Sequence, residues 1–318
     1  MKRIANLFEV AAILSLLSVL AGLLGKYHHL LDLGAHLRLQ ATVTLLISGL
    51  ALRWLKRPKC SKAALFFGVA FSLLLGPYFS FSSTTSEQQH RLFLMNVLTS
   101  NARKAEVISL IEGNNPDFAI LLETDATWIE QLDEALLADW PHHIHIARSD
   151  NFGIALYSKL PFSSCDTIDY STSVPTPSIR ASFQTHKGLL RVIATHSLPP
   201  MNSVSFTARN ELFAELAKDV RQHGADTTIV AGDFNCTPWS PWFKTLCGES
   251  TLHNSMRGQG LGISWTPFGF RILGIPIDHV LVGRRINVTR RHVGDVAGSD
   301  HRPVTVDFSI VQTPAASF

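Results

Sequence analysis

The chain has 318 residues, of which 46% are hydrophobic and 17% charged, and its formal net charge is +3. This apolar content excludes a disordered chain, and 20 Gly with 15 Pro exclude a fibrous one. The net charge hides a division, because residues 1–85 carry nine Lys and Arg against two acids, a net charge of +7, whereas residues 86–318 carry nineteen against 23, a net charge of −4.

Three apolar runs lie in the basic part, at Ile4–Gly25, Leu37–Leu55 and Ala63–Phe81. Each is close to the ~20 residues that a helix needs to cross a hydrocarbon core of ~30 Å. Polar residues do not recur at every third or fourth position, so the runs favour membrane spans over buried helices of a soluble domain. We therefore predict a membrane domain of three transmembrane helices at 1–82, a polar linker at 83–89 and a globular domain at 90–318.

The positive charges predict the orientation of the membrane domain. Residues 53–62 hold five basic residues in ten, and Lys2 and Arg3 precede the first run. Both clusters are expected to stay in the cytoplasm, which leaves the Tyr27–His36 loop and the globular domain outside. The first run is alternatively a cleaved signal peptide, but the absence of a clear small-x-small site favours an uncleaved helix. Histidines of the outer loop are interpreted as interfacial side chains and not as metal ligands.

The four cysteines predict little. An oxidising exterior would permit a bridge between Cys236 and Cys247, but Cys165 would be left over, and no metal-binding spacing such as C-x-x-C is present. Free buried thiols are the simpler interpretation.

Short β-rich runs alternate with helical stretches from His90 onward. The middle of the domain, about 142–196, holds too little helix to cross between parallel strands. Two packed sheets with helices outside therefore fit better than one doubly wound sheet. The predicted helices are Lys104–Glu112 and Val204–His223, and the predicted strands are Arg91–Leu98, Phe118–Leu122, Gly153–Tyr157, Ile179–Phe183, Leu189–Thr195, Thr227–Ala231, Ile277–Val282 and Val304–Ile310.

Asp233 and Asn235 directly follow one of these strands. In an extended chain the side chains at i and i+2 share a face, so both point one way and Phe234 points the other. A carboxylate can orient or deprotonate water, and a neighbouring amide can donate to a phosphoryl oxygen without adding negative charge. The alternative is an ordinary Asx turn after a strand.

Other polar side chains stand at comparable positions. Ser299-Asp300-His301 precedes the final strand, and Asp278 lies inside an apolar strand with His279 on the opposite face. A buried carboxylate at Asp278 would keep the imidazole of His301 charged and oriented; the alternative is a strand-edge Asp with an outward His.

Three further strands each end at, or contain, one polar residue. Glu123 ends an apolar strand, which suits a ligand for a hard metal ion. Asn96 lies within the first strand and His196 ends another. Each of these residues taken alone is more often structural than functional.

Together and in this order, the residues resemble the endonuclease/exonuclease/phosphatase superfamily, which includes pancreatic-type deoxyribonuclease, abasic-site endonucleases, inositol polyphosphate 5-phosphatases and neutral sphingomyelinases. The resemblance covers about residues 90–312 and implies a four-layer α/β sandwich. The preceding apolar helices, with Gly-Asp-Phe-Asn-Cys-Thr-Pro-Trp-Ser at 232–240, are similar to a bacterial membrane-bound branch, of which some members are associated with glycopeptide resistance. This similarity implies a multi-pass protein of the bacterial inner membrane with its catalytic domain on the periplasmic side.

The resemblance also implies a metal site. Glu123, assisted by Asn96, would hold a divalent ion, normally Mg²⁺ with Mn²⁺ as the alternative, and Asp300 would anchor the metal and its waters. Arg180 and Arg209 are candidates for phosphate contacts, but surface arginines are as common, so they stay outside the predicted set.

The catalytic roles follow from the same resemblance. Asp233 would activate water for in-line attack, and Asn235 would contact the phosphoryl group. His301, supported by Asp278, and His196 would stabilise the negative charge that builds on the phosphate oxygens. A metal with preorganised donors supplies the charge stabilisation that phosphoryl transfer needs.

The substrate is less constrained. The net charge of −4 lacks the basic surface that nucleic-acid binding usually needs. Gly-rich apolar residues at 258–277, with Trp239 and Trp242, could form an apolar rim; the alternative is ordinary loop packing. We therefore expect a membrane-anchored phosphodiesterase or phosphatase for a lipid-linked or envelope phosphate. The alternatives are an extracytoplasmic Mg²⁺-dependent nuclease and a non-catalytic envelope binding protein.

Overall fold

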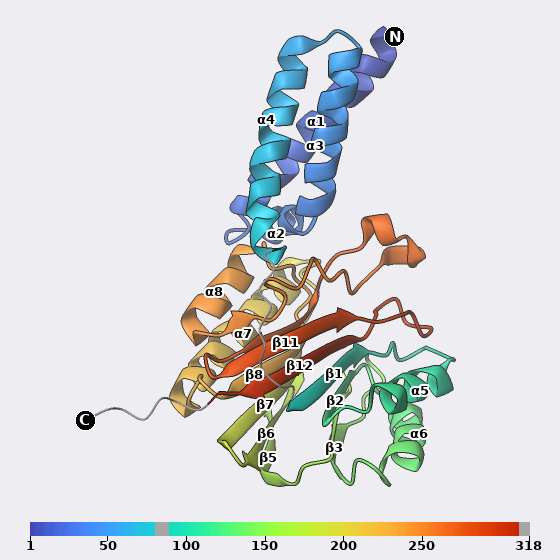
Figure 1. The fold of residues 1–318 in the computed structure, drawn as a ribbon, viewed down its shortest axis with the longest axis vertical. Coiled ribbons are helices and arrows are strands. Elements are labelled where there is room, and N and C mark those ends of the chain that lie inside the picture. Colours follow the sequence, from blue (N-terminus) through green and yellow to red (C-terminus); the bar gives the residue numbers. More distant parts are fainter. Residues whose placement is uncertain (80–88, 312–318) are drawn as a thin grey trace, which may run out of the picture.

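The computed structural model describes residues 1–79 and 89–311, except the side chain of Phe268. A bundle of helices stands at one end of an α/β body (Figure 1). The predicted linker lies outside the described residues, except for Gln89. The bundle contains α1 (Lys2–Leu23), α2 (His29–His36), α3 (Arg38–Trp54) and α4 (Pro58–Leu75).

Two or three segments of this bundle could cross a membrane. Helix α1 and the segment Pro58–Tyr78 are each long and apolar enough, and α2 with α3 meets the same criteria only as a pair bent by 61°. The helices approach closely through small residues, since a Cβ at Gly34 would lie 2.5 Å from the carbonyl oxygen of Ser18. The three predicted spans are thus candidates by length and composition.

The expected Tyr27–His36 loop is wrong, because most of it is helical. His28 caps α2 by accepting a hydrogen bond from the Leu30 N–H through Nδ1, at 3.2 Å. Asp32 and His36 of this short helix are buried against the α/β body. The interpretation of these histidines as interfacial therefore fails for His36.

Two six-stranded mixed sheets form the α/β body. The strands β1 and β2 pair in parallel, as do β7 and β8, and the other pairings are antiparallel. In spatial order, the first sheet contains β11 (Ile286–Val293), β12 (Val304–Ile310), β1 (His90–Asn96), β2 (Phe118–Leu122), β4 (Ile154–Ser158) and β3 (His142–Ile146). The second contains β5 (Phe162–Asp169), β6 (Pro177–Thr185), β7 (Gly188–His196), β8 (Thr228–Asp233), β10 (Asp278–Val282) and β9 (His253–Asn254).

The two sheets pack face to face, and helices cover their outer faces. Leu94, Ile120, Val192 and Ile229 belong to the apolar core that both sheets share. The first sheet is covered by α5 (Lys104–Asn114) and α6 (Ala126–Leu136), and the second by α7 (Ser203–His223) and α8 (Pro241–Ser250). The predicted α/β sandwich is confirmed.

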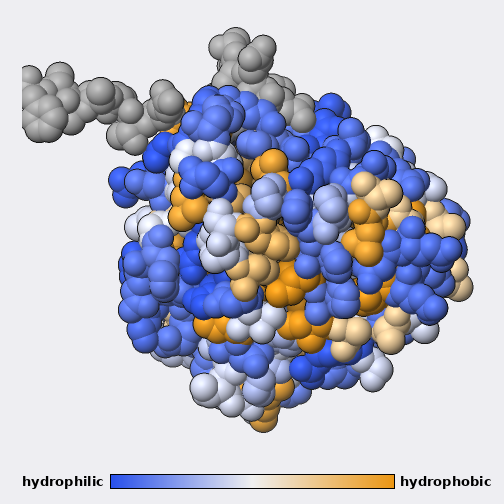
Figure 2. Space-filling view, turned by 90° about the horizontal axis from the view of Figure 1, so that it is seen from below, coloured by the Kyte–Doolittle hydropathy of each residue, from blue (hydrophilic) through white to orange (hydrophobic). Residues whose placement is uncertain are grey.

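The end of the body away from the helical bundle presents a mostly hydrophilic surface on which apolar residues are scattered in small groups (Figure 2). Such a surface suits contact with water. The polar motifs of the sequence lie elsewhere, at the ends of the strands that approach α2.

Candidate active site

Strand pairing places the predicted side chains beside one another. His196, the last residue of β7, pairs with Asp233 at the end of β8, and Asp278 at the start of β10 pairs with Asp233 from the other side. Directly paired residues point to the same face of a sheet. Asn96 ends the parallel neighbour of β2, after which Glu123 follows, so the first sheet brings its two residues to the same region.

Asp233 lies between two imidazoles. The Nε2 atoms of His301 and His196 each lie 3.6 Å from Asp233 Oδ2. On its other side, His301 Nδ1 lies 2.9 Å from Asp278 Oδ2. All four side chains are buried, so these contacts act with little screening by water.

The environment fixes the protonation of this group. Burial alone would lower the pKa of His301, but the Asp278 and Asp233 carboxylates outweigh it and raise that pKa to about 10. Burial opposes ionisation of Asp233, yet His301 and His196 prevail and lower its pKa. Burial, with the charge of Asp233, raises the pKa of Asp278 despite the opposing effect of His301. At neutral pH the arrangement favours a protonated His301 facing an ionised Asp233.

The segment after β8 forms an Asx turn and also contributes side chains to the candidate site, so the two interpretations of its sequence are compatible. The Asn235 N–H donates to Asp233 Oδ1 at 2.8 Å, which is an Asx turn, and Asn235 has a left-handed φ of 45°. Its side-chain amide donates to the Ser197 carbonyl oxygen at 2.8 Å. Asp233 and Asn235 nevertheless line one cavity, and Phe234 is buried in the core beneath α7 and α8.

Glu123 and Asn96 form a second pair at the same place. Asn96 Nδ2 donates to Glu123 Oε1 at 2.7 Å and lies 3.4 Å from Asp233 Oδ2. Glu123 Oε2 is buried without a hydrogen-bond partner among the described residues, and burial raises the pKa of this carboxyl group. A buried oxygen without a partner is costly, and a divalent cation would satisfy it. The donor set therefore fits a hard metal ion.

All eight predicted site residues come together. Asn96 and Asp278 lie behind the surface of a cavity of about 630 Å³. The other six line it: Glu123, His196, Asp233, Asn235, Asp300 and His301. Of the acids, Asp300 accepts a hydrogen bond from Trp265 Nε1 through Oδ2, at 2.7 Å. Oxygen and nitrogen donors of Asp233, Asp278 and His301 also lie within 4.8 Å of one another.

Several lining residues are absent from the predicted catalytic and metal-binding set, although Trp265 lies in the 258–277 segment that was expected to form an apolar rim. Phe152 packs on His196 with ring centroids 4.9 Å apart, and Trp265 carries the hydrogen bond to Asp300. Leu33 and Leu37 reach the cavity from the helical bundle. The Gly-rich 258–277 segment pointed toward the cavity, but no local signal connects α2 with a site some 200 positions away.

The two arginines left out of the predicted set do not line the cavity. Arg180 pairs with Asp166 and Asp219, and Arg209 pairs with Asp32 of α2. Each guanidinium is thus committed to carboxylates.

The cysteine thiols are not bridged, since Cys236 and Cys247 are both free. The Cys236 carbonyl oxygen instead accepts a hydrogen bond from His279 Nε2 at 2.9 Å. His279 is buried on the opposite side of β10 from Asp278, as the alternation predicts.

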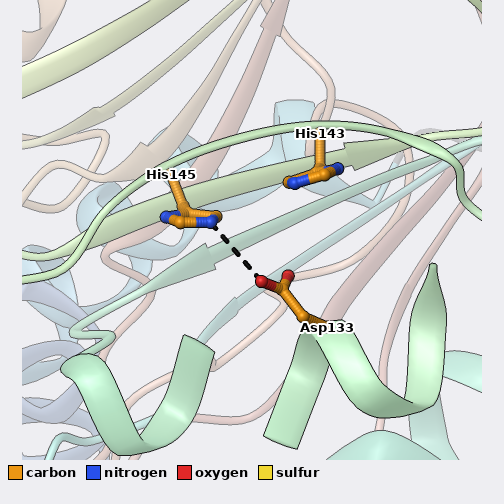
Figure 3. A group of neighbouring side chains, drawn as sticks. All are labelled: Asp133, His143 and His145. Atoms are coloured by element: carbon orange, nitrogen blue, oxygen red, sulfur yellow. Dashed lines mark ion pairs between the residues drawn. The ribbon is translucent and has the colours of Figure 1, made fainter. Parts of the chain in front are cut away.

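A separate group of side chains lies between α6 and β3: Asp133, His143 and His145, whose donor atoms are within 4.8 Å of one another (Figure 3). His145 Nε2 lies 3.6 Å from Asp133 Oδ2, and Asp133 accepts a hydrogen bond from the Tyr157 hydroxyl at 2.8 Å. The two imidazoles are stacked with an interplanar angle of 19°. Asp133 is thus in contact with His145 and the Tyr157 hydroxyl.

Comparison with known protein families identifies the family of this chain. A sequence model described as "Endonuclease/Exonuclease/phosphatase family" matches residues 93–301, which include all eight site residues. The chain belongs to the endonuclease/exonuclease/phosphatase family. Members of this family are phosphoester hydrolases and generally use divalent metal ions. No curated protein matches the chain.

Solved structures share the fold of this family member. An endonuclease/exonuclease/phosphatase from Beutenbergia cavernae is 19% identical with a TM-score of 0.60, and the match covers 72% of this chain and 74% of that one. The 3'-5' exonuclease NExo from Neisseria meningitidis is 22% identical with a TM-score of 0.59, covering 69% and 99%. Sphingomyelinase C from Streptomyces griseocarneus is 14% identical with a TM-score of 0.52, covering 70% and 99%. At these identities the likeness shows the fold alone.

Proposed function

We propose that this protein is a membrane-anchored, metal-dependent phosphodiesterase or phosphatase that acts on a lipid-linked or envelope phosphate outside the bacterial inner membrane. One observation carries the proposal. The buried carboxylate of Asp233, held between His196 and His301, faces a cavity that also has Leu33 and Leu37 of the helical bundle in its wall.

The side chains of the cavity can divide the work of hydrolysis. The ionised Asp233 is suited to orient and deprotonate an attacking water. The imidazolium of His301, held by Asp278, can stabilise the negative charge that develops on phosphoryl oxygens, and His196 adds a second donor. The Asn235 amide nitrogen carries two hydrogens, so one can face the phosphoryl group while the other bonds the Ser197 carbonyl.

Glu123, Asn96 and Asp300 would hold the metal, Mg²⁺ or Mn²⁺. The partnerless buried oxygen of Glu123 supports this assignment. When bound, the cation supplies charge stabilisation at the phosphoryl oxygens. Asn96 keeps Glu123 oriented through its 2.7 Å hydrogen bond, and the Trp265 indole does the same for Asp300.

The charge of the bundle supports the orientation. The basic residues 53–62 span the turn between α3 and α4, which lies at the end of the bundle away from the α/β body (Figure 1). A basic turn held in the cytoplasm would leave the α/β body on the opposite side. A reporter phosphatase fused after residue 85 should then be active, and activity only of a cytoplasmic reporter at that point would contradict the orientation.

The alternative is an extracytoplasmic nuclease. The net charge of −4 on residues 86–318 argues against it, because nucleic-acid binding depends on neutralising many phosphates with basic side chains. The aliphatic side chains in the cavity wall, such as Leu33, Leu37 and Ile277, suit the hydrocarbon chain of a lipid.

The test compares three substrates with the full chain in detergent and Mg²⁺: bis-p-nitrophenyl phosphate, plasmid DNA and a polyprenyl pyrophosphate. Asp233→Ala and His301→Ala serve as controls for contaminating activity. We expect release from the lipid and the small ester, and none by either variant. Activity on DNA without activity on the lipid would establish the nuclease. Equal background activity from the wild type and both variants would contradict the enzyme and favour the non-catalytic envelope binding protein.

A further inference from the structure

We infer that the apolar side of the cavity, with α2 as one wall, is a subsite for the hydrocarbon chain of a lipid phosphate substrate. This inference rests on the proposed function and names the part of the site that would recognise the lipid. The subsite is shared between the helical bundle and the α/β body. Its lining residues are Leu33, Leu37, Met201, Ile275, Ile277 and the Pro199–Pro200 pair.

The cavity is chemically divided. Glu123, His196, Asp233 and Asn235 line it from the ends of strands, and His36 and Asp150 add further polar groups. Apolar lining side chains come from α2, from the 199–201 segment and from the approach to β10. A small phosphate ester would occupy only the polar side. The volume of about 630 Å³ and the apolar side chains among the lining residues fit a longer amphipathic molecule with its phosphate at Asp233.

A buried ion pair fixes α2 in this position. Arg209 of α7 lies 2.8 Å from Asp32 Oδ2, and both side chains have no solvent exposure. The Ser240 hydroxyl donates to Asp32 Oδ1 at 2.7 Å. A charge pair that is removed from water holds its partners in one geometry because either charge left alone is strongly unfavourable. The ion pair and the hydrogen bond thus hold α2 against α7 and the segment after β8.

The same helix holds the segment that follows Asp233. The Thr237 N–H donates to His36 Nδ1 at 3.3 Å, and the Thr237 hydroxyl lies 3.2 Å from the same atom. Thr237 is two residues beyond Asn235. Helix α2 thus supports the polar side of the cavity while it walls the apolar side.

An apolar lip beside the bundle offers an entrance from the bilayer. The turns Pro267–Gly269 and Arg271–Leu273 project next to the lower end of the bundle, in orange in Figure 1. Phe270 and Ile272 are 60% and 80% exposed. Gln40 of α3 donates to the Gly274 carbonyl oxygen at 2.8 Å, so the lip is fastened to the bundle. Exposed apolar side chains beside this end of the bundle suit insertion among lipid tails.

The experiment uses the full chain in detergent and two substrates, a long-chain polyprenyl pyrophosphate and bis-p-nitrophenyl phosphate. The variant Leu33→Asn/Leu37→Asn should raise KM for the long-chain lipid by on the order of 10-fold or more, because two apolar contacts are lost. Its kcat/KM for the small ester should fall much less than its kcat/KM for the lipid, so the ratio of the two values should shift toward the ester. Leu30→Asn is the matched control, since Leu30 lies on the same helix, is 62% exposed and does not line the cavity.

A chain-length series keeps the inference testable if the double variant does not fold. For the wild type, KM should fall from a five-carbon isoprenoid pyrophosphate to the long-chain lipid. A KM independent of chain length, or an equal loss on both substrates in a folded double variant, would overturn the subsite. Activity on the small ester with none on any lipid would overturn it while the hydrolase stands; no activity on either substrate would remove the proposed function itself.

Discussion

Two buried ion pairs on helix α7 have different surroundings. Near its start, Arg209 meets Asp32 of the helical bundle at 2.8 Å, and neither side chain is exposed. Near its end, Asp219 meets Arg191 of β7 at 2.9 Å, with both side chains slightly exposed. The first pair joins the bundle to the α/β body, and the second holds α7 on its own sheet.

The difference separates stability from catalysis. Asp32 also accepts from Ser240, 208 residues away, in the segment that follows Asp233. Asp219 instead accepts from the Tyr170 hydroxyl at 2.7 Å, away from the cavity. Loss of the first pair should therefore disturb folding and the active site together, whereas loss of the second should disturb folding alone.

The largest expected effect comes from breaking the first pair. Asp32→Asn leaves the Arg209 guanidinium buried without its carboxylate, which should cost about 3–5 kcal/mol in the free energy of unfolding. Activity on a lipid substrate should fall as well. Denaturant unfolding of the full chain in detergent measures the first effect. The double variant Asp32→Leu/Arg209→Met should recover most of the stability, because neither charge remains; a single-variant loss below about 1 kcal/mol would contradict the account.

Breaking the second pair should cost less. Asp219→Asn removes charged hydrogen bonds and should lower the free energy of unfolding by at most about 1.5–3 kcal/mol, because the partners are partly exposed. Activity should stay unchanged. Burial would raise the pKa of Asp219, but Tyr170 and Arg191 prevail and lower it. A lowered pKa gives stability that is present above the ordinary value of about 3.9 and is lost as pH falls through the folded value. Unfolding measured against pH should show a flatter acid limb below about pH 4 in the variant; an unaltered limb would count against this role.

A third ion pair on the same helix should contribute least to the free energy of unfolding. Lys218 and Glu215 lie 3.2 Å apart with both side chains more than half exposed. Glu215→Gln should change the free energy of unfolding by less than about 0.5 kcal/mol and leave activity as it is. The same unfolding measurement applies, and a loss comparable to that of Asp219→Asn would show that burial does not set the order.

The site residues were predictable because each lies in or directly beside a recognisable strand. Asp233, Glu123 and His196 end apolar runs that can only be buried strands, and the order of the motifs along the chain then indicated the family. Pairing between strands supplied the rest, since Asp278 and His196 flank Asp233 in the same sheet.

Other elements gave no such signal. Strand β5 exposes most of its residues, and β11 carries the polar run Thr289-Arg290-Arg291-His292, so neither shows a clear apolar pattern. Helix α2 is only eight residues long and lies between two apolar runs, which makes it look like a loop. Its contact with the cavity depends on the tertiary pairing of Asp32 with Arg209, which no local pattern encodes.

The most direct test of the account is the initial rate of phosphate release from a polyprenyl pyrophosphate by the full chain in detergent and Mg²⁺, for wild type and Asp233→Asn. The substitution keeps the size of the side chain but removes the base, so the rate should fall by about 10³-fold or more. Thermal unfolding of both proteins shows whether the variant is folded. A folded variant with a rate within tenfold of wild type would contradict the assignment of Asp233 and, with it, the proposed mechanism.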